Sequence, residues 1–268
     1  MPTVTFAKDW QAVFKRFDLE TFQDFFEYSD GSLVNKNTKR DVLAFSLPLE
    51  DGKKEFFMKR FHKPHIKDML FTLTNFGRLC SQAECEWNNA NILLENRIDT
   101  YKPVCFGSDT VCGIESGSFF VTEKLEGKPL TDFAACCWTD LDQSQKQQII
   151  ISIAKLVGKI HNAKLSLPDF YLWHIFIDQN SLAVIDQNSL AVIDLHRMKI
   201  NTSSRQQQIR NLAALDFSML DEYFDEPSRR LLMETYLSEY SQNDKEAFCR
   251  GVRLRSDKLA ARRECPKY

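Results

Sequence analysis

The chain has 268 residues, of which 43% are hydrophobic and 27% charged, and its formal net charge is −2. A chain of this length and apolar content buries a substantial core, so its composition excludes a disordered or fibrous protein. A net charge near zero gives no general attraction for nucleic acid, and we expect no nucleic-acid partner. Charged residues interrupt the N-terminus, and no run approaches the roughly 18 apolar residues of a membrane span, so we expect a cytoplasmic protein. The eight cysteines form no CxxC pair and no compact disulfide spacing, so we expect most of them to be reduced and buried.

Short segments rich in aromatic and β-branched residues dominate the first half of the chain. Residues 43–49 and 54–61 predict the two strands of a hairpin, with the turn at Asp51-Gly52. Residues 81–96 then predict a helix, and 100–107 and 116–125 predict two further strands.

Beyond residue 126 the pattern becomes mostly helical. Residues 143–164 carry apolar side chains at helical spacing, and 204–220 and 227–240 predict two more helices. We therefore expect an α+β fold with two lobes joined by a hinge near 123–128. The N-terminal lobe, residues 1–125, is expected to be β-rich, and the C-terminal lobe, residues 126–268, α-rich.

Lys59 is the first candidate functional residue. In the strand 54–61 it shares a face with Phe57 and Phe61, so its ammonium group starts from an inward, apolar surface. Such a lysine requires an anion, and Glu86 on the inward face of the helix 81–96 is the expected partner. Taken alone, the same lysine also fits a solvated edge strand.

Aspartates in the second half could carry phosphoryl-transfer chemistry. Asp169 follows the long helix, His174 stands five residues later, and a following apolar stretch ends in Ile-Asp. A carboxylate beside a sugar hydroxyl can orient it and accept its proton, and a second carboxylate can hold Mg²⁺ against nucleotide phosphates. Taken alone, each aspartate is more commonly a helix cap or a turn residue.

The order of these features along the chain is that of the protein kinases. The chain resembles the kinase-like family that phosphorylates the inner core of bacterial lipopolysaccharide, the Kdo and heptose kinases. The resemblance rests on the segments FFMKRF, EWNNANILLENRIDT, DFYLWHIFI, VIDLHRM and RNLAAL. It implies a bilobal protein-kinase-like fold with ATP and Mg²⁺ as cofactors. It also implies roles for five residues: Lys59 as the phosphate-binding lysine, Glu86 as its partner, Asp169 as the catalytic carboxylate, His174 as a metal or phosphate contact, and Asp194 as the magnesium ligand.

The chain departs from the family pattern at two places, the residues before Asp169 and the loop expected to cover the nucleotide phosphates. Leu167-Pro168 stands where the family has a histidine and a basic residue, which leaves room for a weakened or inactive enzyme. No glycine-rich loop is visible, and residues 29–41, with Lys36, Asn37 or backbone amides, are the candidate cover for the phosphates. The adenine is expected to pair with the backbone between Glu123 and Leu125.

The resemblance implies an ATP-dependent kinase acting on a sugar hydroxyl of the lipopolysaccharide core. The alternatives are a kinase-like enzyme for a protein or small-molecule alcohol and a pseudokinase that serves as an interaction module. The C-terminal segment is locally basic and is either a solvated helix face or a peripheral contact with lipid A phosphates or the inner membrane. Its basic residues are Arg250, Arg253, Arg255, Lys258, Arg262 and Arg263.

An octapeptide, IDQNSLAV, occurs twice in succession from residue 177, so that Asp178, Asp186 and Asp194 each follow an isoleucine. The spacing from Asp169 favours Asp186 as the metal ligand, whereas the following Leu-His-Arg-Met favours Asp194. An insertion of eight residues at a hairpin turn preserves the face of every later side chain, because strand side chains alternate with a period of two. We therefore expect strand stems at 174–177 and 190–194, with Asp194 as the ligand; a register slip that uses Asp186 is the alternative.

Overall fold

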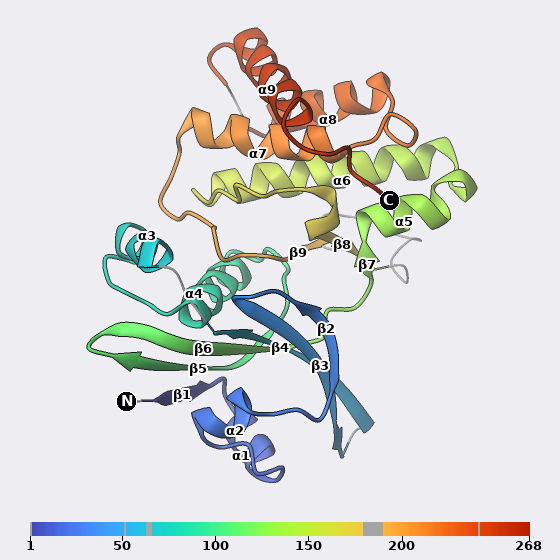
Figure 1. Ribbon diagram of the computed structural model, residues 1–268. Coiled ribbons are helices and arrows are strands. Elements are labelled where there is room, and N and C mark those ends of the chain that lie inside the picture. The colour runs from blue at the N-terminus through green and yellow to red at the C-terminus, as the bar shows by residue number, and fades with distance from the viewer. Residues whose placement is uncertain (1, 51, 63–65, 179–189, 241) are drawn as a thin grey trace. The chain divides into compact units, whose positions relative to one another are not determined.

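The structure, a computed structural model, describes residues 2–50, 52–62, 66–178, 190–240 and 242–268. The chain divides into two compact units (Figure 1). The first comprises Met1–Leu94 and Tyr101–Leu125, and the second comprises Glu95–Thr100 and Glu126–Tyr268. No helix within the described residues is long and apolar enough to cross a membrane.

An antiparallel sheet forms the frame of the first unit. In the described residues it has six strands in the spatial order β1-β5-β6-β4-β3-β2. The strands are β1 (Thr3–Phe6), β2 (Ser32–Lys36), β3 (Arg40–Leu49), β4 (Gly52–Phe61), β5 (Pro103–Val111) and β6 (Ile114–Glu123). The helices of this unit are α1 (Trp10–Lys15), α2 (Phe22–Phe26), α3 (Ile66–Phe76) and α4 (Gln82–Glu95). The predicted hairpin is confirmed as β3–β4, although Asp51 of the predicted turn lies outside the described residues.

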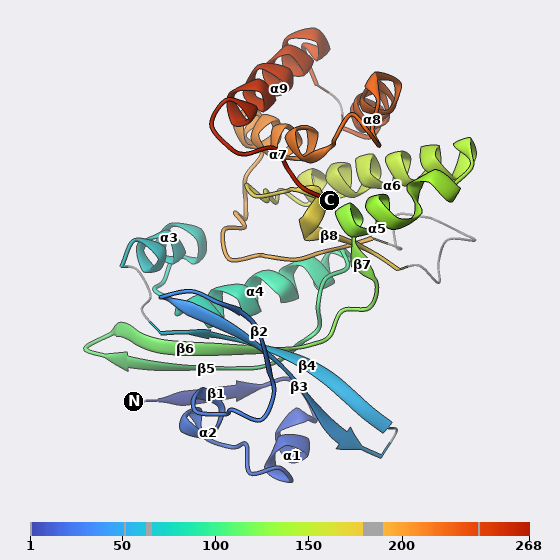
Figure 2. The ribbon, with the colours of Figure 1, turned by 45° about the vertical axis from the view of Figure 1, so that its right-hand side comes forward.

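The two faces of β4 have different neighbours. Phe56 and Met58 are fully buried in a core with Phe14 and Phe25 of α1 and α2. Figures 1 and 2 show α1 and α2 on one side of the sheet and α4 on the other. Because successive side chains of a strand point to opposite faces, the residues between Phe56 and Phe61 alternate between the core and the α4 side. This alternation places Lys59 on the side of α4.

Helices dominate the second unit. They are α5 (Leu130–Cys137), α6 (Gln143–Asn162), α7 (Arg205–Ser218), α8 (Glu226–Glu239) and α9 (Lys245–Ala260), with short 3-10 turns η1 (Trp138–Asp140) and η2 (Leu172–His174). A small sheet of the described residues has the order β7-β8-β9, formed by β7 (Lys128–Pro129), β8 (Ile175–Ile177) and β9 (Leu190–Val192). The predicted helices 143–164, 204–220 and 227–240 are confirmed as α6, α7 and α8, with ends that differ by one or two residues.

Local sequence explains where α6 begins and which face it buries. The side chain of Asp142 accepts from the backbone N–H of Gln145, whose own side chain accepts from the backbone N–H of Asp142. This capping box satisfies two donors that would otherwise lack partners at the helix start. The apolar stripe that predicted the helix is buried throughout, and includes Ile149, Ile153 and Ile160.

The β8–β9 hairpin has the register expected for the octapeptide. Ile175 pairs with Val192 and Ile177 with Leu190, and the N–H of Ile193 donates to the carbonyl of His174 at 2.9 Å. The strand that leads to Asp194 is therefore the one that pairs with β8. The second octapeptide copy lies mostly outside the described residues, as does Asp186.

The cysteines match the prediction only in part. Cys136 and Cys137, which are neighbours in α5, form a disulfide that the sequence analysis did not predict. The other six, all within the described residues, form no disulfide: Cys80, Cys85 and Cys105 are buried, Cys249 is half-buried, and Cys112 and Cys265 are exposed.

Candidate functional site

In the first unit, Lys59 and Glu86 form a close ion pair. The Lys59 Nζ lies 2.7 Å from Glu86 Oε1 and 2.8 Å from Oε2. The Glu86 side chain is 1% exposed and that of Lys59 20%. The hydroxyl of Tyr101 donates to Glu86 Oε2 at 3.2 Å. A buried carboxylate held by two donors fixes the lysine head group, which still reaches solvent and can contact an anion. The pair is the one that strand and helix periodicity predicted.

A pocket of about 470 Å³ lies over β3 and β4, where Phe45 and Phe56 of the core and Phe57 of the face that carries Lys59 line it; Lys59 itself does not line the pocket. Ala44, Ser46 and Phe57 line it from the strands, and Gly31 lines it from the segment before β2. Gly31 is needed there, because a Cβ would lie 2.6 Å from the carbonyl oxygen of Ala44. Phe57 stands two residues before Lys59, so strand alternation aims both side chains to one side. The pocket is large enough for part of a small ligand such as a nucleotide.

The three residues of the predicted hinge have different neighbours. Lys124 lines the pocket, and its ammonium group lies 2.6 Å from Glu55 Oε2. Glu123 instead pairs with Lys54 at 3.0 Å, and Leu125 is half-buried. Neither Glu123 nor Leu125 is among the residues that line the pocket. Alternation at the end of β6 separates Lys124 from its two neighbours, a signal that was present in the sequence.

The proposed phosphate cover forms a hairpin turn. Asn37 lies between β2 and β3, and its side-chain oxygen accepts from the backbone N–H groups of Lys39 and Arg40, both at 2.9 Å. The Asn37 side chain is thereby used to hold the turn. Lys36, at the end of β2, is exposed.

In the second unit, Asp169 and His174 are joined within one loop. The ring Nδ1 of His174 lies 2.8 Å from the carbonyl oxygen of Asp169. A carbonyl can only accept, so Nδ1 carries the proton and Nε2 of a neutral ring has a free lone pair. That Nε2 lies 3.6 Å from Asp194 Oδ2. Two acceptor atoms at this separation are suited to hold a metal cation between or beside them.

Asp194 is held in a particular orientation at the end of the hairpin. Its backbone φ is 61°, in the left-handed region that aspartate tolerates better than most residues. The Nδ1–H of His196 donates to Asp194 Oδ1 at 2.9 Å, and the carboxylate side chain is 21% exposed. The carboxylate therefore has one oxygen fixed by His196 and the other directed toward His174. Such a group is suited to a hard divalent cation.

Arg197 links this segment back to the catalytic loop. Its Nη1 lies 3.1 Å from Asp169 Oδ2, and the Asp169 side chain is 17% exposed. The predicted residues Asp169, His174 and Asp194 are thus brought together, with His196 and Arg197 added. Both added residues belong to the segment VIDLHRM, which carries the family resemblance, and neither was expected to have a role of its own.

Asp178 lies at the other end of the hairpin from this cluster. It follows β8, four residues beyond His174, and a Cβ on Gly127 would lie 3.1 Å from its Cα. A strand rises about 3.3 Å per residue, so Asp178 is roughly 13 Å along the chain from His174. Of the three aspartates that follow an isoleucine, Asp194 lies beside His174, Asp178 does not, and Asp186 is not described.

A buried polar chain supports the backbone just before Asp169. Asn211 of α7 accepts through Oδ1 from the Leu167 N–H at 3.1 Å and from His161 Nε2 at 3.0 Å. The His161 Nδ1 lies 2.9 Å from the Tyr236 hydroxyl. Burial lowers the pKa of His161 to about 4, opposed by its hydrogen bond to Asn211. The neutral ring therefore donates from Nε2 to Asn211 and accepts from Tyr236 at Nδ1, so the main chain at Leu167 is anchored.

Comparison with known proteins identifies the family of this chain. Residues 24–251 match the family described as "Lipopolysaccharide kinase (Kdo/WaaP) family". The "Lipopolysaccharide core heptose(I) kinase WaaP" of Escherichia coli (strain K12) is 26% identical over 204 residues, which cover 72% of each chain. The protein of the same name from Pseudomonas aeruginosa is 24% identical over 157 residues, covering 58% of this chain and 59% of its own.

A solved structure titled "WaaP in complex with acyl carrier protein" has the same fold. It matches with a TM-score of 0.73 at 20% identity and covers 96% of this chain and 99% of its own. The predicted α+β, bilobal protein-kinase-like fold is confirmed by this match, by the β-sheet of the first unit and by the helices of the second. The match of the family model to residues 24–251 establishes that the chain belongs to the lipopolysaccharide kinase (Kdo/WaaP) family.

Proposed function

We propose that the protein is an ATP-dependent phosphotransferase that phosphorylates a sugar hydroxyl of the lipopolysaccharide inner core, on heptose or Kdo. The observation that carries the proposal is the cluster of Asp169, His174 and Asp194 in a chain of this family. Asp169 and Asp194 come from separate segments and both lie beside His174. Phosphoryl transfer requires one carboxylate to orient the hydroxyl and another to hold the metal ion, and these two residues would supply them.

The residues of the first unit support nucleotide binding. The Lys59 ammonium, fixed by Glu86, is suited to contact ATP phosphates as a point charge. The pocket lined by Phe57 and Lys124 would receive the remainder of the nucleotide, with backbone groups between Glu123 and Leu125 beside the base. Each of these assignments is part of the proposal.

The residues of the second unit support transfer. Asp169 would accept a hydrogen bond and then the proton from the acceptor hydroxyl, whose oxygen attacks the γ-phosphorus in line as the bond to the ADP oxygen breaks. Asp194, oriented by His196 and with Oδ2 beside His174, would hold Mg²⁺, and His174 would contact the metal or a phosphate. When bound, Mg²⁺ supplies charge neutralisation for the phosphoryl oxygens. Arg197 keeps the Asp169 carboxylate in place through its ion pair.

Leu167-Pro168 is compatible with an active enzyme. The side chain at position 167 is buried, and its backbone N–H is held by Asn211. Anchoring the main chain fixes the position of Asp169 without a histidine at position 167. This contact favours the enzyme over the pseudokinase.

Transfer assays test the proposal directly. Purified lipopolysaccharide and its core oligosaccharides are incubated with ATP, Mg²⁺ and the protein, and the products are analysed by mass spectrometry. We expect one added phosphate on a core sugar. Asp194→Asn is expected to lower kcat by about 100-fold or more, equivalent to about 3 kcal/mol, while Asp178→Asn serves as the matched control and keeps its rate. Activity lost in Asp186→Asn but kept in Asp194→Asn would assign the metal to the other register.

Nucleotide binding separates the remaining alternatives. A ligand at about 100 times its Kd stabilises a protein by about 2.7 kcal/mol, so Mg²⁺-dependent ATP binding is visible as a rise in Tm. Stabilisation that disappears in Asp194→Asn, without transfer to any core sugar, would favour a protein or small-molecule alcohol as acceptor. No response to ATP at all would favour a pseudokinase module.

We also propose that the protein works at the cytoplasmic face of the inner membrane as a peripheral protein. Lys258 of α9 and Arg262 after it are exposed, and neither forms an ion pair within the described residues. A basic side chain near an anionic membrane surface contributes about 1 kcal/mol. Co-sedimentation with anionic vesicles tests this: binding unchanged by Lys258→Gln and Arg262→Gln would contradict it.

A further inference from the structure

Arginines surround the loop that carries Asp169. Arg197 pairs with the Asp169 carboxylate at 3.1 Å. The guanidinium carbon of Arg263, which follows α9, lies 5.2 Å from the centre of the Tyr171 ring. Tyr171 is buried two residues after Asp169, and its N–H donates to the Asp169 carbonyl at 2.9 Å. Two arginines distant in sequence therefore contact the same short loop.

Two more arginines approach the loop from α7 and α9. Figures 1 and 2 show these helices side by side, and a Cβ on Gly251 of α9 would lie 3.0 Å from the Ile209 side chain of α7. Arg210 follows Ile209 directly and precedes Asn211, the residue that holds Leu167. Arg255 lies one helical turn after Gly251, on the same side of α9.

The charges that act on Arg210 include those of Arg255, Arg197 and Asp169. Burial lowers its pKa, and the positive charges of Arg255 and Arg197 lower it further, while Asp169 raises it. Burial raises the pKa of Tyr171, and the charge of Asp169 acts in the same direction. The charges of Arg263, Arg210 and Arg197 partly oppose this rise. The charges of Arg255 and Arg197 therefore act on Arg210, and those of Arg263, Arg210 and Arg197 act on Tyr171.

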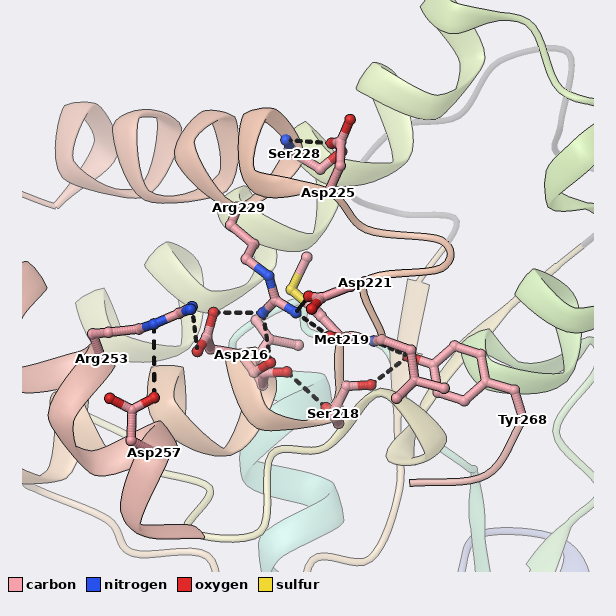
Figure 3. Close-up of polar contacts among 12 residues, drawn as sticks. Asp216, Ser218, Met219, Asp221, Asp225, Ser228, Arg229, Arg253, Asp257 and Tyr268 are labelled. Carbon is pink, nitrogen blue, oxygen red and sulfur yellow. Dashed lines mark hydrogen bonds and ion pairs between the residues drawn. The ribbon is translucent and has the colours of Figure 1, made fainter. Parts of the chain in front are cut away.

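Within the described part of the chain, Arg197 is the member of this group that has an acidic partner; Arg210, Arg255 and Arg263 form no ion pair. Other arginines nearby are paired. Figure 3 shows Arg253 with Asp216 at 3.8 Å and with Asp257 at 3.7 Å. Like charges that crowd a partly desolvated site destabilise the folded protein, and an anion bound among them offsets that cost.

We propose that Arg210, Arg255 and Arg263, together with Arg197, bind a carboxylate or phosphate group of the acceptor and so place its hydroxyl at Asp169. The proposal rests on the function proposed above and names the acceptor as an anionic sugar. Guanidinium groups bind both anions with paired hydrogen bonds, which suits recognition by geometry as well as by charge. The stacked rings of Tyr171 and Trp173, 4.4 Å apart, stiffen the loop to which these groups are attached.

Calorimetric titration of the full chain tests the proposal without requiring turnover. The probe is a deacylated core oligosaccharide that carries both carboxylates and phosphates. Arg210→Gln and Arg255→Gln are each expected to raise its Kd about tenfold or more, as for the loss of a hydrogen bond between charged groups. Arg253→Gln, on the same helix but with its charge neutralised by two aspartates, is the matched control and should keep the Kd within about twofold. Because Arg255 is exposed, its variant keeps the test valid if Arg210→Gln fails to fold.

Modified probes distinguish the two anions. If the wild-type protein binds only the carboxyl-reduced oligosaccharide with a higher Kd than the unmodified one, the arginines bind a carboxylate. If only the dephosphorylated oligosaccharide has the higher Kd, they bind a phosphate. Unchanged affinity in Arg255→Gln and in Arg210→Gln, or no binding to the wild-type protein, would overturn the inference. Oligosaccharide that binds but is never phosphorylated would instead count against the proposed function.

Discussion

His161 is expected to make the stability of the second unit sensitive to acid. Its ring is 2% exposed and bridges Tyr236 and Asn211. Burial lowers its pKa from the ordinary 6.5 to about 4. Between about pH 4 and 6.5, His161 is therefore protonated in the unfolded chain but neutral in the folded protein. The stability that His161 provides is lost as the pH falls from about 6.5 to about 4.

The size of this effect follows from the two pKa values. One pKa unit corresponds to about 1.4 kcal/mol, so the full loss below pH 4 is about 3 kcal/mol, and at about pH 5 it is about 2 kcal/mol. In His161→Gln the titrating group is absent. The variant leaves one buried partner, Asn211 or Tyr236, without its hydrogen bond, which costs about 1–3 kcal/mol at neutral pH.

Urea denaturation followed by circular dichroism at about pH 7.5 and about pH 5 measures both quantities. We expect His161→Gln to be less stable than the wild-type protein at the higher pH and nearly equal to it at the lower pH. Other titrating groups affect both proteins alike, so the difference between them isolates His161. A deficit of the same size at both pH values would refute the assigned protonation state and hydrogen bonds.

Three further predictions concern single residues. Burial raises the pKa of Glu115 to about 7, so the protonated carboxyl stabilises the folded protein at low pH and this stability is lost as the pH rises from about 4.5 to about 7. In denaturation curves, Glu115→Gln should remove up to about 3 kcal/mol of that loss. The same pH dependence in the variant and the wild-type protein would contradict this prediction. The Arg229 side chain is 12% exposed and forms ion pairs with Asp216 and Asp221 (Figure 3). Arg229→Met should therefore lower the free energy of unfolding by about 3–5 kcal/mol. Asp221→Asn, which removes only the exposed partner, should lower it by under about 1 kcal/mol. Lys59→Met should raise the KM for ATP about tenfold or more in the transfer assay with an unchanged acceptor KM, and equal effects on both would argue against a nucleotide role.

Periodicity predicted the parts of the fold in which one face of an element is buried. The apolar stripe of α6 and the alternation of β4 both survive in the structure, and the latter was enough to pair Lys59 with Glu86. The strand β2 was missed because every one of its residues is exposed and no alternation marks it. Such a strand is specified by its pairing with β3 and not by its own sequence.

The site was predicted where the chain order carried the information. Asp169, His174 and Asp194 were identified from their order and motif, and the structure brings them together. The contacts of Tyr101 with Glu86 and of Asn211 with Leu167 were not predicted, because they depend on tertiary packing that no pattern along the sequence marks. Lys124 lies within the predicted hinge and lines the pocket, while the backbone contacts predicted for the hinge stay a prediction.

The two ends of the β8–β9 hairpin differ in how they respond to a change of sequence. One end carries His174 and Asp194, while the other end, at Ile177 and Leu190, opens onto the duplicated octapeptide. An in-frame duplication at the open end adds chain length where no paired residue has to move, and an even number of residues keeps the same side chains facing inward. A duplication of eight residues between the two strands therefore leaves the pairing of β8 with β9, and with it His174 and Asp194, unchanged.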